Sequence, residues 1–191
     1  MIKNLTEGKP LKLLFFFSLP MLMGNLFQQL YNMVDSIVVG NFVGADALAA
    51  VGASFPVVFL AVALAAGLSM GCNVVISQLF GAGRVREMKT TVSTALIGQF
   101  VLSAAITVIG EIISPGILRL LKTPDNIMAD SLIYLRIYFG GSIFLFIYNT
   151  LNGIYNALGD SKTPLYFLML STLTNIVLDL LFVIKFHMGV A

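Results

Sequence analysis

Two acidic residues, Asp35 and Asp179, stand within long stretches of otherwise uncharged sequence. A carboxylate in the hydrocarbon of a bilayer costs about 3 kcal/mol on insertion scales, so such a residue usually has a function and a partner. Carboxylate oxygens are the hard ligands that a small cation prefers. A carboxyl group in a low-dielectric cavity is equally able to hold a proton near neutral pH. The two acids therefore predict a site for a proton or for a cation such as sodium.

Polar side chains accompany each acid on one helical face, at spacings of three and four residues: Asn25, Gln28 and Asn32 before Asp35, and Thr172 and Asn175 before Asp179. At 100° per residue the first set falls within an arc of about 80°. A single Asn or Thr in a spanning helix is often only a contact between helices, worth about 1 kcal/mol. The pairing of Asp179 with an amide favours a cation or proton site, whereas an interfacial role is the alternative for Asp35.

The depths of the two acids are comparable. At 1.5 Å per residue, Asp35 and Asp179 lie roughly 34 and 25 Å above the lysine that opens each helix. Both carboxyl groups are then in the outer half of the membrane, where they could share one site. A third polar stripe has the same spacings of three and four residues and consists of Asn149, Asn152 and Asn156. Such stripes are expected to face one another or a wet cavity, because lipid cannot satisfy them.

The elements that carry these residues are predicted to be membrane-spanning helices. The 191 residues are 58% hydrophobic and only 10% charged, against about 25% in a soluble domain. This composition excludes a soluble enzyme, a secreted disulfide scaffold and a disordered tail. Apolar runs long enough for a helical crossing predict five spans, at about 13–36, 46–78, 90–114, 130–157 and 163–186. The fold class is thus an all-α, polytopic membrane protein.

Basic residues predict the orientation. The positive-inside rule places the side richer in Lys and Arg in the cytoplasm. That side holds Lys3, Lys9, Lys12, Arg84, Arg86, Lys89 and Lys162, and the other holds Arg119, Lys122 and Lys185. The N-terminus is therefore expected in the cytoplasm, and the tyrosines Tyr31, Tyr134 and Tyr138 near the outer interface.

Several other residues predict structural features of the helices. Pro20 should bend the first helix, either as a fixed kink or as a moving hinge. The pair Gly67 and Gly71 is the spacing of a close helix contact. Glu111 and Arg136 could form an ion pair. The sequence shows no phosphate loop, zinc spacing or Ser/His/Asp set, so we expect no enzyme, no cofactor and no nucleic-acid partner.

Four stretches resemble the multidrug and toxic compound extrusion (MATE) transporters, mainly the bacterial multidrug branch. They are VDSI at 34–37 with GADALAAVG at 44–52, SQLFGAGR at 77–84, Asn152-Gly153 with GDSKTP at 159–164, and NIVLD at 175–179. The resemblance spans nearly the whole chain. It implies a twelve-helix fold of two lobes, of which residues 1–191 are the amino-terminal lobe without its sixth helix and without the second lobe.

The resemblance also implies site residues. Asp35, Asn175 and Asp179 match the ion-coupling positions of that lobe, where sodium or a proton would bind. Tyr134 and Asn152 match hydrogen-bonding positions around them, with Gln28, Asn32 and Thr172 as further polar support. Pro20 matches the proline at which the first helix bends.

The function implied is antiport at the bacterial plasma membrane, with export of cationic amphipathic drugs in exchange for protons or sodium. The expected partners are drug-like cations, the bilayer and the second lobe. One alternative is a lipid-linked oligosaccharide flippase, which should have a strongly basic cavity. Another is an inactive half-transporter fragment. The drug, the coupling ion, the completeness of the chain and the oligomeric state do not follow from the sequence.

Overall fold

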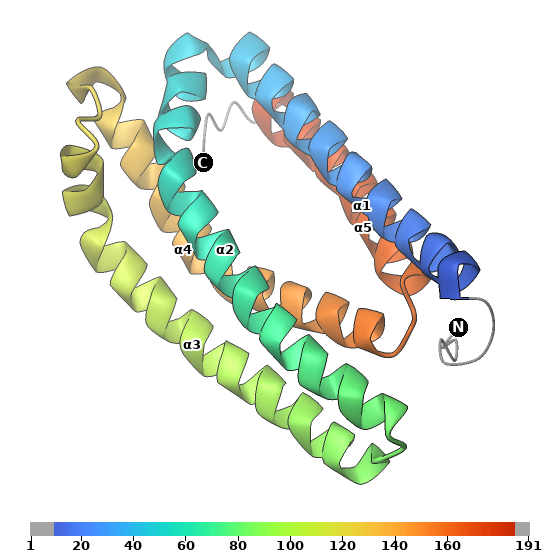
Figure 1. Ribbon diagram of the computed structural model, residues 1–191. Helices are drawn as coiled ribbons and strands as arrows, with labels where there is room; N and C mark the ends of the chain where they lie inside the picture. The colour runs from blue at the N-terminus through green and yellow to red at the C-terminus, as the bar shows by residue number, and fades with distance from the viewer. Residues whose placement is uncertain (1–9, 186–191) are drawn as a thin grey trace.

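The structure is a computed structural model that describes residues 10–185, and five long helices dominate it (Figure 1). They are α1 (Pro10–Val38), α2 (Ala45–Gly81), α3 (Val85–Leu120), α4 (Asp125–Ala157) and α5 (Lys162–Leu180). Two π-helical turns, η1 (Val39–Val43) and η2 (Leu181–Lys185), extend α1 and α5. All five helices are long and apolar enough to cross a membrane, which confirms the predicted polytopic helical fold.

Helices α1, α2 and α3 extend beyond the predicted spans at both ends, and α4 begins earlier than predicted. Helix α3, for example, begins at Val85 rather than near residue 90 and ends at Leu120. Hydropathy marks only the part of a helix that lies in hydrocarbon, whereas the hydrogen-bonded backbone continues into the polar flanks. The predicted end of the fifth span at 186 and the basic residues Lys3 and Lys9 lie outside the described residues.

Helices α2, α3 and α4 form one packed bundle. Its buried apolar cluster contains Val57 and Ala61 of α2, Leu118 of α3, and Leu135 and Phe139 of α4. Glycine permits the closest approach, because a Cβ on Gly110 would lie 2.4 Å from Cδ1 of Phe139. These three helices therefore interlock through small residues, as spanning helices commonly do.

Hydroxyl groups bridge the same three helices. Ser131 of α4 donates to the carbonyl of Ala50 on α2 at 3.3 Å. Ser69 of α2 donates to the carbonyl of Asn149 on α4 at 2.7 Å, and Thr107 of α3 donates to the carbonyl of Phe139 at 3.0 Å. In a medium that offers no water, such bonds satisfy the hydroxyls and fix the relative height of the helices.

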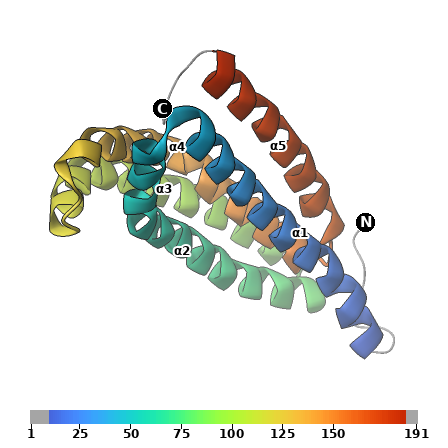
Figure 2. The same ribbon diagram turned by 90° about the horizontal axis from the view of Figure 1, so that it is seen from above.

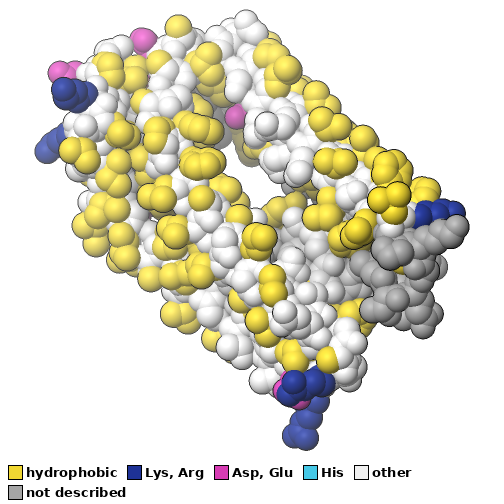
Figure 3. All heavy atoms as spheres, viewed as in Figure 1, with side chains coloured by type: hydrophobic (Ala, Val, Ile, Leu, Met, Phe, Trp, Pro, Cys, Tyr) yellow, Lys and Arg dark blue, Asp and Glu magenta, His cyan; other side chains and the backbone are white. Residues whose placement is uncertain are grey.

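Helices α1 and α5 form a separate pair that packs along its length, although they are the first and the last described helices of the chain (Figures 1 and 2). Contacts between α5 and α4 are few, and the pair meets the bundle mainly where α1 turns through η1 and Gly44 into α2. Gly44 has φ 126°, a conformation that favours glycine. An opening separates the pair from the bundle, and an acidic side chain lies at its rim (Figure 3).

The outer surface is that of a membrane protein. Large apolar side chains such as Ile112 (72% exposed) and Phe144 (77% exposed) face outward. Lys and Arg side chains gather at the ends of the molecule in Figure 3. The predicted ion pair is present, with Arg136 Nε of α4 3.7 Å from Glu111 Oε2 of α3.

The Gly67 and Gly71 spacing does not mark a close helix contact. A Cβ on either residue would meet no described atom within 4 Å. The two glycines have the required spacing on α2. However, none of the other described helices crosses α2 closely at that face. The contact suggested by the spacing is therefore not made among residues 10–185, and Gly71 lines a groove between α2 and α3.

Candidate functional site

Asp35 of α1 and Asp179 of α5 lie close enough for their carboxyl groups to interact electrostatically. The packing of α1 against α5 produces this proximity. A Cβ on Gly24 would lie 3.5 Å from Leu168 Cδ2, so side chains of α5 pack against this glycine of α1 below the acids. The two carboxyl groups, both half-buried, therefore lie on neighbouring helices within range of each other's charge.

Tyr31 and Asn175 complete the cluster on the same two helices. Tyr31 precedes Asp35 by one helical turn, interacts with both carboxyl groups, and lies within hydrogen-bonding reach of the Asn175 side chain. Asn175 precedes Asp179 by one turn on α5. Residues four apart share a face of a helix, so one face of α1 meets one face of α5 at this level.

Two tyrosines of α4 face the same cluster. Tyr134 interacts electrostatically with Asp35 and with Tyr31. The ring of Tyr138 lies 6.4 Å from that of Tyr134, and its hydroxyl also interacts with Tyr31. The cluster of Tyr31, Asp35, Tyr134, Tyr138, Asn175 and Asp179 therefore joins the α1–α5 pair to the α4 side of the opening.

Two oxygens of the cluster lack a partner among the described residues. Asn175 Oδ1 and Asp179 Oδ2 are buried and accept no hydrogen bond from them. Leaving a buried acceptor unsatisfied costs about 1–3 kcal/mol, and more for a charged group. A cation bound by these oxygens, or a proton on the carboxyl group, would remove that cost. The donor set is of the hard oxygen type that sodium prefers.

A cation here would need more than acidic side chains. Among residues 10–185, no three His, Cys, Asp or Glu side chains are grouped so as to hold a metal ion. The two carboxylates would be supplemented by the Asn175 carbonyl oxygen and the Tyr31 hydroxyl. Asp35, Asn175 and Asp179, which the sequence analysis proposed as sodium ligands, are thus brought together.

The remaining predicted residues of α1 and α5 are placed differently. Asn32 is exposed and donates to Gln29 Oε1 at 3.2 Å. Gln28 is exposed as well, and Thr172 is half-buried on α5, one turn before Asn175 and two turns before Asp179. Pro20 lies inside α1, which remains helical from Pro10 to Val38.

Asn152 lies far from the acids along α4. At about 1.5 Å per residue it is roughly 27 Å from Tyr134. Its Oδ1 accepts a hydrogen bond of 3.0 Å from Asn156, whose own Oδ1 is buried without a partner among the described residues. Asn152 and Asn156 therefore form a second polar spot near the α4–α5 turn, and the structure does not bring Asn152 to the acids.

Tyr31 and Tyr138 are members of the cluster that the sequence does not single out as site residues. Sequence reasoning places both at the outer interface, where amphipathic rings are common. The available signal is spacing, because Tyr31 precedes Asp35 by four residues and Tyr138 follows Tyr134 by four. Tyrosine at this depth fits a membrane interface equally well, so spacing alone does not separate the two roles.

The turn between α4 and α5 holds a further carboxylate with an evident structural role. Asp160 accepts hydrogen bonds from the backbone N–H groups of Lys162 and Thr163, both at 3.2 Å, and from the Thr163 hydroxyl at 2.8 Å. Burial raises the pKa of the Asp160 carboxyl, but the hydrogen bonds that it accepts, those from Thr163 among them, lower it to about 2. An ionised Asp160 therefore caps the start of α5.

Comparison with known proteins gives consistent matches. The family model described as MatE matches residues 20–181. A probable multidrug resistance protein of Bacillus subtilis, YpnP, is 36% identical over 98% of this chain and 42% of its own length. Another from the same organism, YoeA, is 38% identical over 85% of this chain and 35% of its own length.

The fold matches solved structures as well. An outward-facing multidrug resistance transporter of the MATE family superimposes with a TM-score of 0.89 and 32% identity, over 96% of this chain and 40% of that one. The chain thus spans less than half the length of the curated relatives that it matches. That proportion is the one expected for a single lobe.

Proposed function

The chain belongs to the MATE family of transporters, and from this premise we propose that it forms the ion-coupling part of a secondary antiporter in a bacterial plasma membrane. The antiporter exports cationic amphipathic compounds in exchange for protons or sodium. The N-terminus lies in the cytoplasm. The completed protein includes a second lobe, because alternating access requires two parts that move relative to each other.

One observation carries the proposal. Two acids from the first and fifth helices lie together, and the adjacent Asn175 and Asp179 oxygens are buried without partners among the described residues. A site of this kind releases free energy when a cation or proton arrives. Binding of the cation or proton therefore stabilises the arrangement of helices in which the two acids lie close to each other.

Coupling follows from that preference. The ion stabilises the arrangement in which α1 and α5 present both acids to it, and the drug stabilises another. Because coupling free energy is reciprocal, ion binding must weaken drug affinity by the same factor by which drug weakens ion affinity. The six-residue cluster contains residues of α1, α4 and α5. An ion bound at the two acids therefore also interacts with the tyrosines on the α4 side of the opening.

The flippase alternative finds less support. That function needs a basic cavity to hold a pyrophosphate group. The cluster instead contains two acids and three phenols, and Arg136, on the same helix as Tyr134 and Tyr138, is paired with Glu111. The names of the closely matching B. subtilis relatives also refer to multidrug resistance.

Transport measurements on the full-length protein test the proposal. Efflux of a fluorescent cationic drug from proteoliposomes is driven in turn by a proton gradient and by a sodium gradient. We expect efflux with one of the two gradients, and Asp179→Asn is expected to abolish it at equal expression and insertion. Drug efflux by Asp179→Asn at the wild-type rate would overturn the assignment of the acids as coupling groups.

A further inference from the structure

An open groove runs between α2 and α3, in the half of these helices that is next to the α2–α3 turn. Its volume is about 550 Å³, within the range of sites for small molecules. Gly71 of α2 and Gly98 of α3 hollow it, because a Cβ at either position would meet no described atom within 4 Å. This α2–α3 groove therefore offers space along two helices whose other residues keep their side chains.

The length of the α2–α3 groove fits one leaflet of a bilayer. Its lining on α3 extends from Thr90 to Leu102, which is about 18 Å at about 1.5 Å per residue. One leaflet contributes about 15 Å of hydrocarbon, half of the whole core. Leu68 and Val75 of α2 are 44% and 45% exposed, so the groove is open at the surface of the described helices. An acyl chain can thus enter the groove from the side and lie along it.

The lining changes in character along the groove. Far from the α2–α3 turn it contains Leu68 and Leu102, and the amide of Gln99 there is only 4% exposed. Next to the turn it contains the hydroxyls of Thr90 and Thr91. A molecule that matches this lining has an apolar chain at one end and a polar group at the other.

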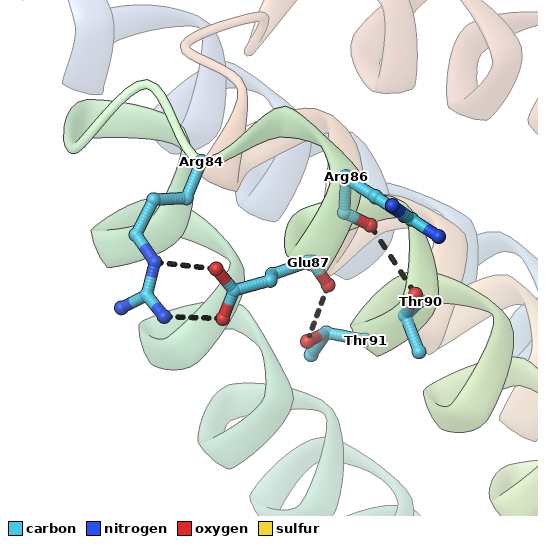
Figure 4. Close-up of polar contacts among 5 residues, drawn as sticks. All are labelled: Arg84, Arg86, Glu87, Thr90 and Thr91. Atoms are coloured by element: carbon cyan, nitrogen blue, oxygen red, sulfur yellow. Dashed lines mark hydrogen bonds and ion pairs between the residues drawn. The ribbon is translucent and has the colours of Figure 1, made fainter.

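The α2–α3 turn and the start of α3 carry an excess of positive charge. Arg84, Arg86 and Lys89 are accompanied by a single acid, Glu87, and all four side chains are exposed. Arg84 Nε donates to Glu87 Oε1 at 2.6 Å, and Arg84 Nη2 pairs with Glu87 Oε2 (Figure 4). Neither Arg86 nor Lys89 forms an ion pair among residues 10–185. Two cations are therefore left to attract an anion.

Arg86 continues the face of α3 that lines the groove. The Thr90 hydroxyl donates to the Arg86 carbonyl at 3.2 Å, so Arg86 lies one helical turn before Thr90 on the same face. In Figure 4 the Arg86 side chain extends away from the Arg84–Glu87 pair. A guanidinium binds phosphate oxygens through charge-assisted hydrogen bonds. The Thr90 hydroxyl can rotate its hydrogen from the carbonyl to such an oxygen.

We propose that the α2–α3 groove binds an anionic phospholipid of the cytoplasmic leaflet, such as phosphatidylglycerol. The phosphate group pairs with Arg86 and Lys89 and accepts a hydrogen bond from Thr90. One acyl chain lies along the groove and reaches Leu68 and Leu102. Basic pockets between spanning helices bind anionic head groups in other membrane proteins. The choice of leaflet rests on the proposed orientation, but binding requires neither the two acids nor drug transport.

Cys72 supplies a reporter, since it lines the groove, is partly accessible, and is the one cysteine in the 191-residue sequence. Full-length protein is placed in phosphatidylcholine nanodiscs in which a rising fraction of the lipid is phosphatidylglycerol with the same acyl chains. The rate of Cys72 modification by methyl methanethiosulfonate, a neutral reagent, is followed by peptide mass spectrometry. We expect the rate to fall several-fold and to reach a plateau as the phosphatidylglycerol fraction rises.

Paired variants separate a specific site from the general surface charge. Arg86→Gln combined with Lys89→Gln should raise the phosphatidylglycerol fraction needed for half-maximal protection about tenfold, because both charges near the phosphate are lost. Arg119→Gln combined with Lys122→Gln is the matched control, since it removes the same charge at the other end of α3 and should keep wild-type protection. Gly98→Leu fills the groove and should make the Cys72 rate independent of phosphatidylglycerol.

Each outcome decides the matter. A Cys72 rate that does not depend on phosphatidylglycerol, or wild-type protection in the Arg86 and Lys89 variant, would overturn the proposal. Loss of protection in the control variant as well would show an effect of surface charge alone and overturn it too. Protection by soluble glycerol 1-phosphate would assign the site to a free phosphate compound instead of a lipid.

Two further points keep the test decisive. Should Gly98→Leu not fold, the paired charge variants carry the test alone. Asp179→Asn should lose drug efflux and keep the protection of Cys72 by phosphatidylglycerol. Failure of the antiport proposal is therefore distinguishable from failure of the lipid site.

Discussion

The hydroxyl of Tyr31 is the group through which the acidic cluster is connected. It interacts with Asp35, Asp179 and Tyr134 and lies within reach of Asn175. A phenol hydroxyl can donate to one carboxylate and still accept from an amide. Tyr31 is thus placed to act as a positioning residue for the pair of acids.

Removal of this hydroxyl is expected to weaken ion coupling. Hydrogen bonds to charged groups contribute about 1.5–3 kcal/mol, so Tyr31→Phe should lower apparent ion affinity roughly tenfold or more in transport assays. Tyr166→Phe is the control, because Tyr166 is 66% exposed on α5. Equal ion dependence in the two variants would contradict the role given to Tyr31.

The ionised Asp160 carboxylate stabilises the start of α5 in a pH-dependent way. Its pKa is lowered from 3.8 to about 2 in the folded protein, so its contribution is complete above about pH 4 and is lost as the pH falls toward 2. Replacing an N-terminal cap by Ala costs about 1 kcal/mol, and Asp160→Ala should lower stability by a similar amount at pH 6.

Unfolding measurements in micelles at several pH values check this expectation. The difference between wild type and Asp160→Ala should shrink between pH 4 and pH 2, because protonation of the wild-type carboxyl removes what the variant already lacks. Lys162→Ala serves as the control within the same turn. A difference that does not change with pH would show that the charge of Asp160 is irrelevant to the cap.

At the scale of helices, glycines and hydroxyls determine how closely α2, α3 and α4 pack. A Cβ on Gly153 of α4 would lie 2.7 Å from Ser69 Oγ of α2, and the next atoms are beyond 3.5 Å. The same Ser69 hydroxyl donates to the carbonyl of Asn149. The Ser69 hydroxyl therefore joins α2 to α4, and it also limits the size of the side chain that α4 can have at position 153.

A double-mutant cycle tests this packing. Gly153→Ala alone should destabilise the protein by about 1–3 kcal/mol, the usual cost of overpacking. In a Ser69→Ala background the obstructing atom is absent, so the same substitution should cost less or become favourable through helix propensity. Identical costs in both backgrounds would show that Ser69 and Gly153 do not meet.

The contact between Gly110 and Phe139 restricts substitution of the glycine more severely. A Cβ at Gly110 would overlap Cδ1, Cγ and Cε1 of the ring at 2.4–2.6 Å, and the ring is buried. Gly110→Ala should therefore lower the thermal unfolding temperature of the full-length protein. Gly140→Ala, with free space around its Cα, should raise it slightly, because alanine favours a helix. The reverse order would contradict the close approach of α3 and α4 at this level.

The sequence could predict helices and depth, but not lateral partners. Hydropathy locates five helices, and the similar depth of Asp35 and Asp179 predicts a shared site. Periodicity gives the face of a helix, yet it does not say which other helix that face meets. For this reason sequence reasoning groups Asn152 with the acids although it lies near the other end of α4, and Gly67 with Gly71 suggests a contact that the described helices do not make.

At the scale of the whole molecule, the bundle of α2, α3 and α4 is one body and the α1–α5 pair is another. The bundle is bonded across its interior, whereas the pair is attached mainly through two turns with glycines in positive φ, Gly44 and Gly159. Motion of the pair against the bundle is therefore the low-cost deformation of this fold.

Distance measurements between spin labels test this division. Labels at Ile112 and Phe144, exposed on α3 and α4, should give a narrow distribution at pH 5 and at pH 8. Labels at Phe144 and Phe167, on α4 and α5, should give a broader one that shifts between the two pH values, because occupancy of the acids changes. Equal widths for both pairs would indicate that the five helices move as one body.

The pairing of α1 with α5 has a consequence for biosynthesis. The ribosome delivers helices in chain order, so α1 enters the membrane long before its partner is translated. Helices α2, α3 and α4 can assemble with each other meanwhile, and Asp35 has no acid or amide from α5 beside it. The two carboxyl groups meet only after the fifth helix has left the translocon, which makes the pocket between them the last part of these five helices to be assembled.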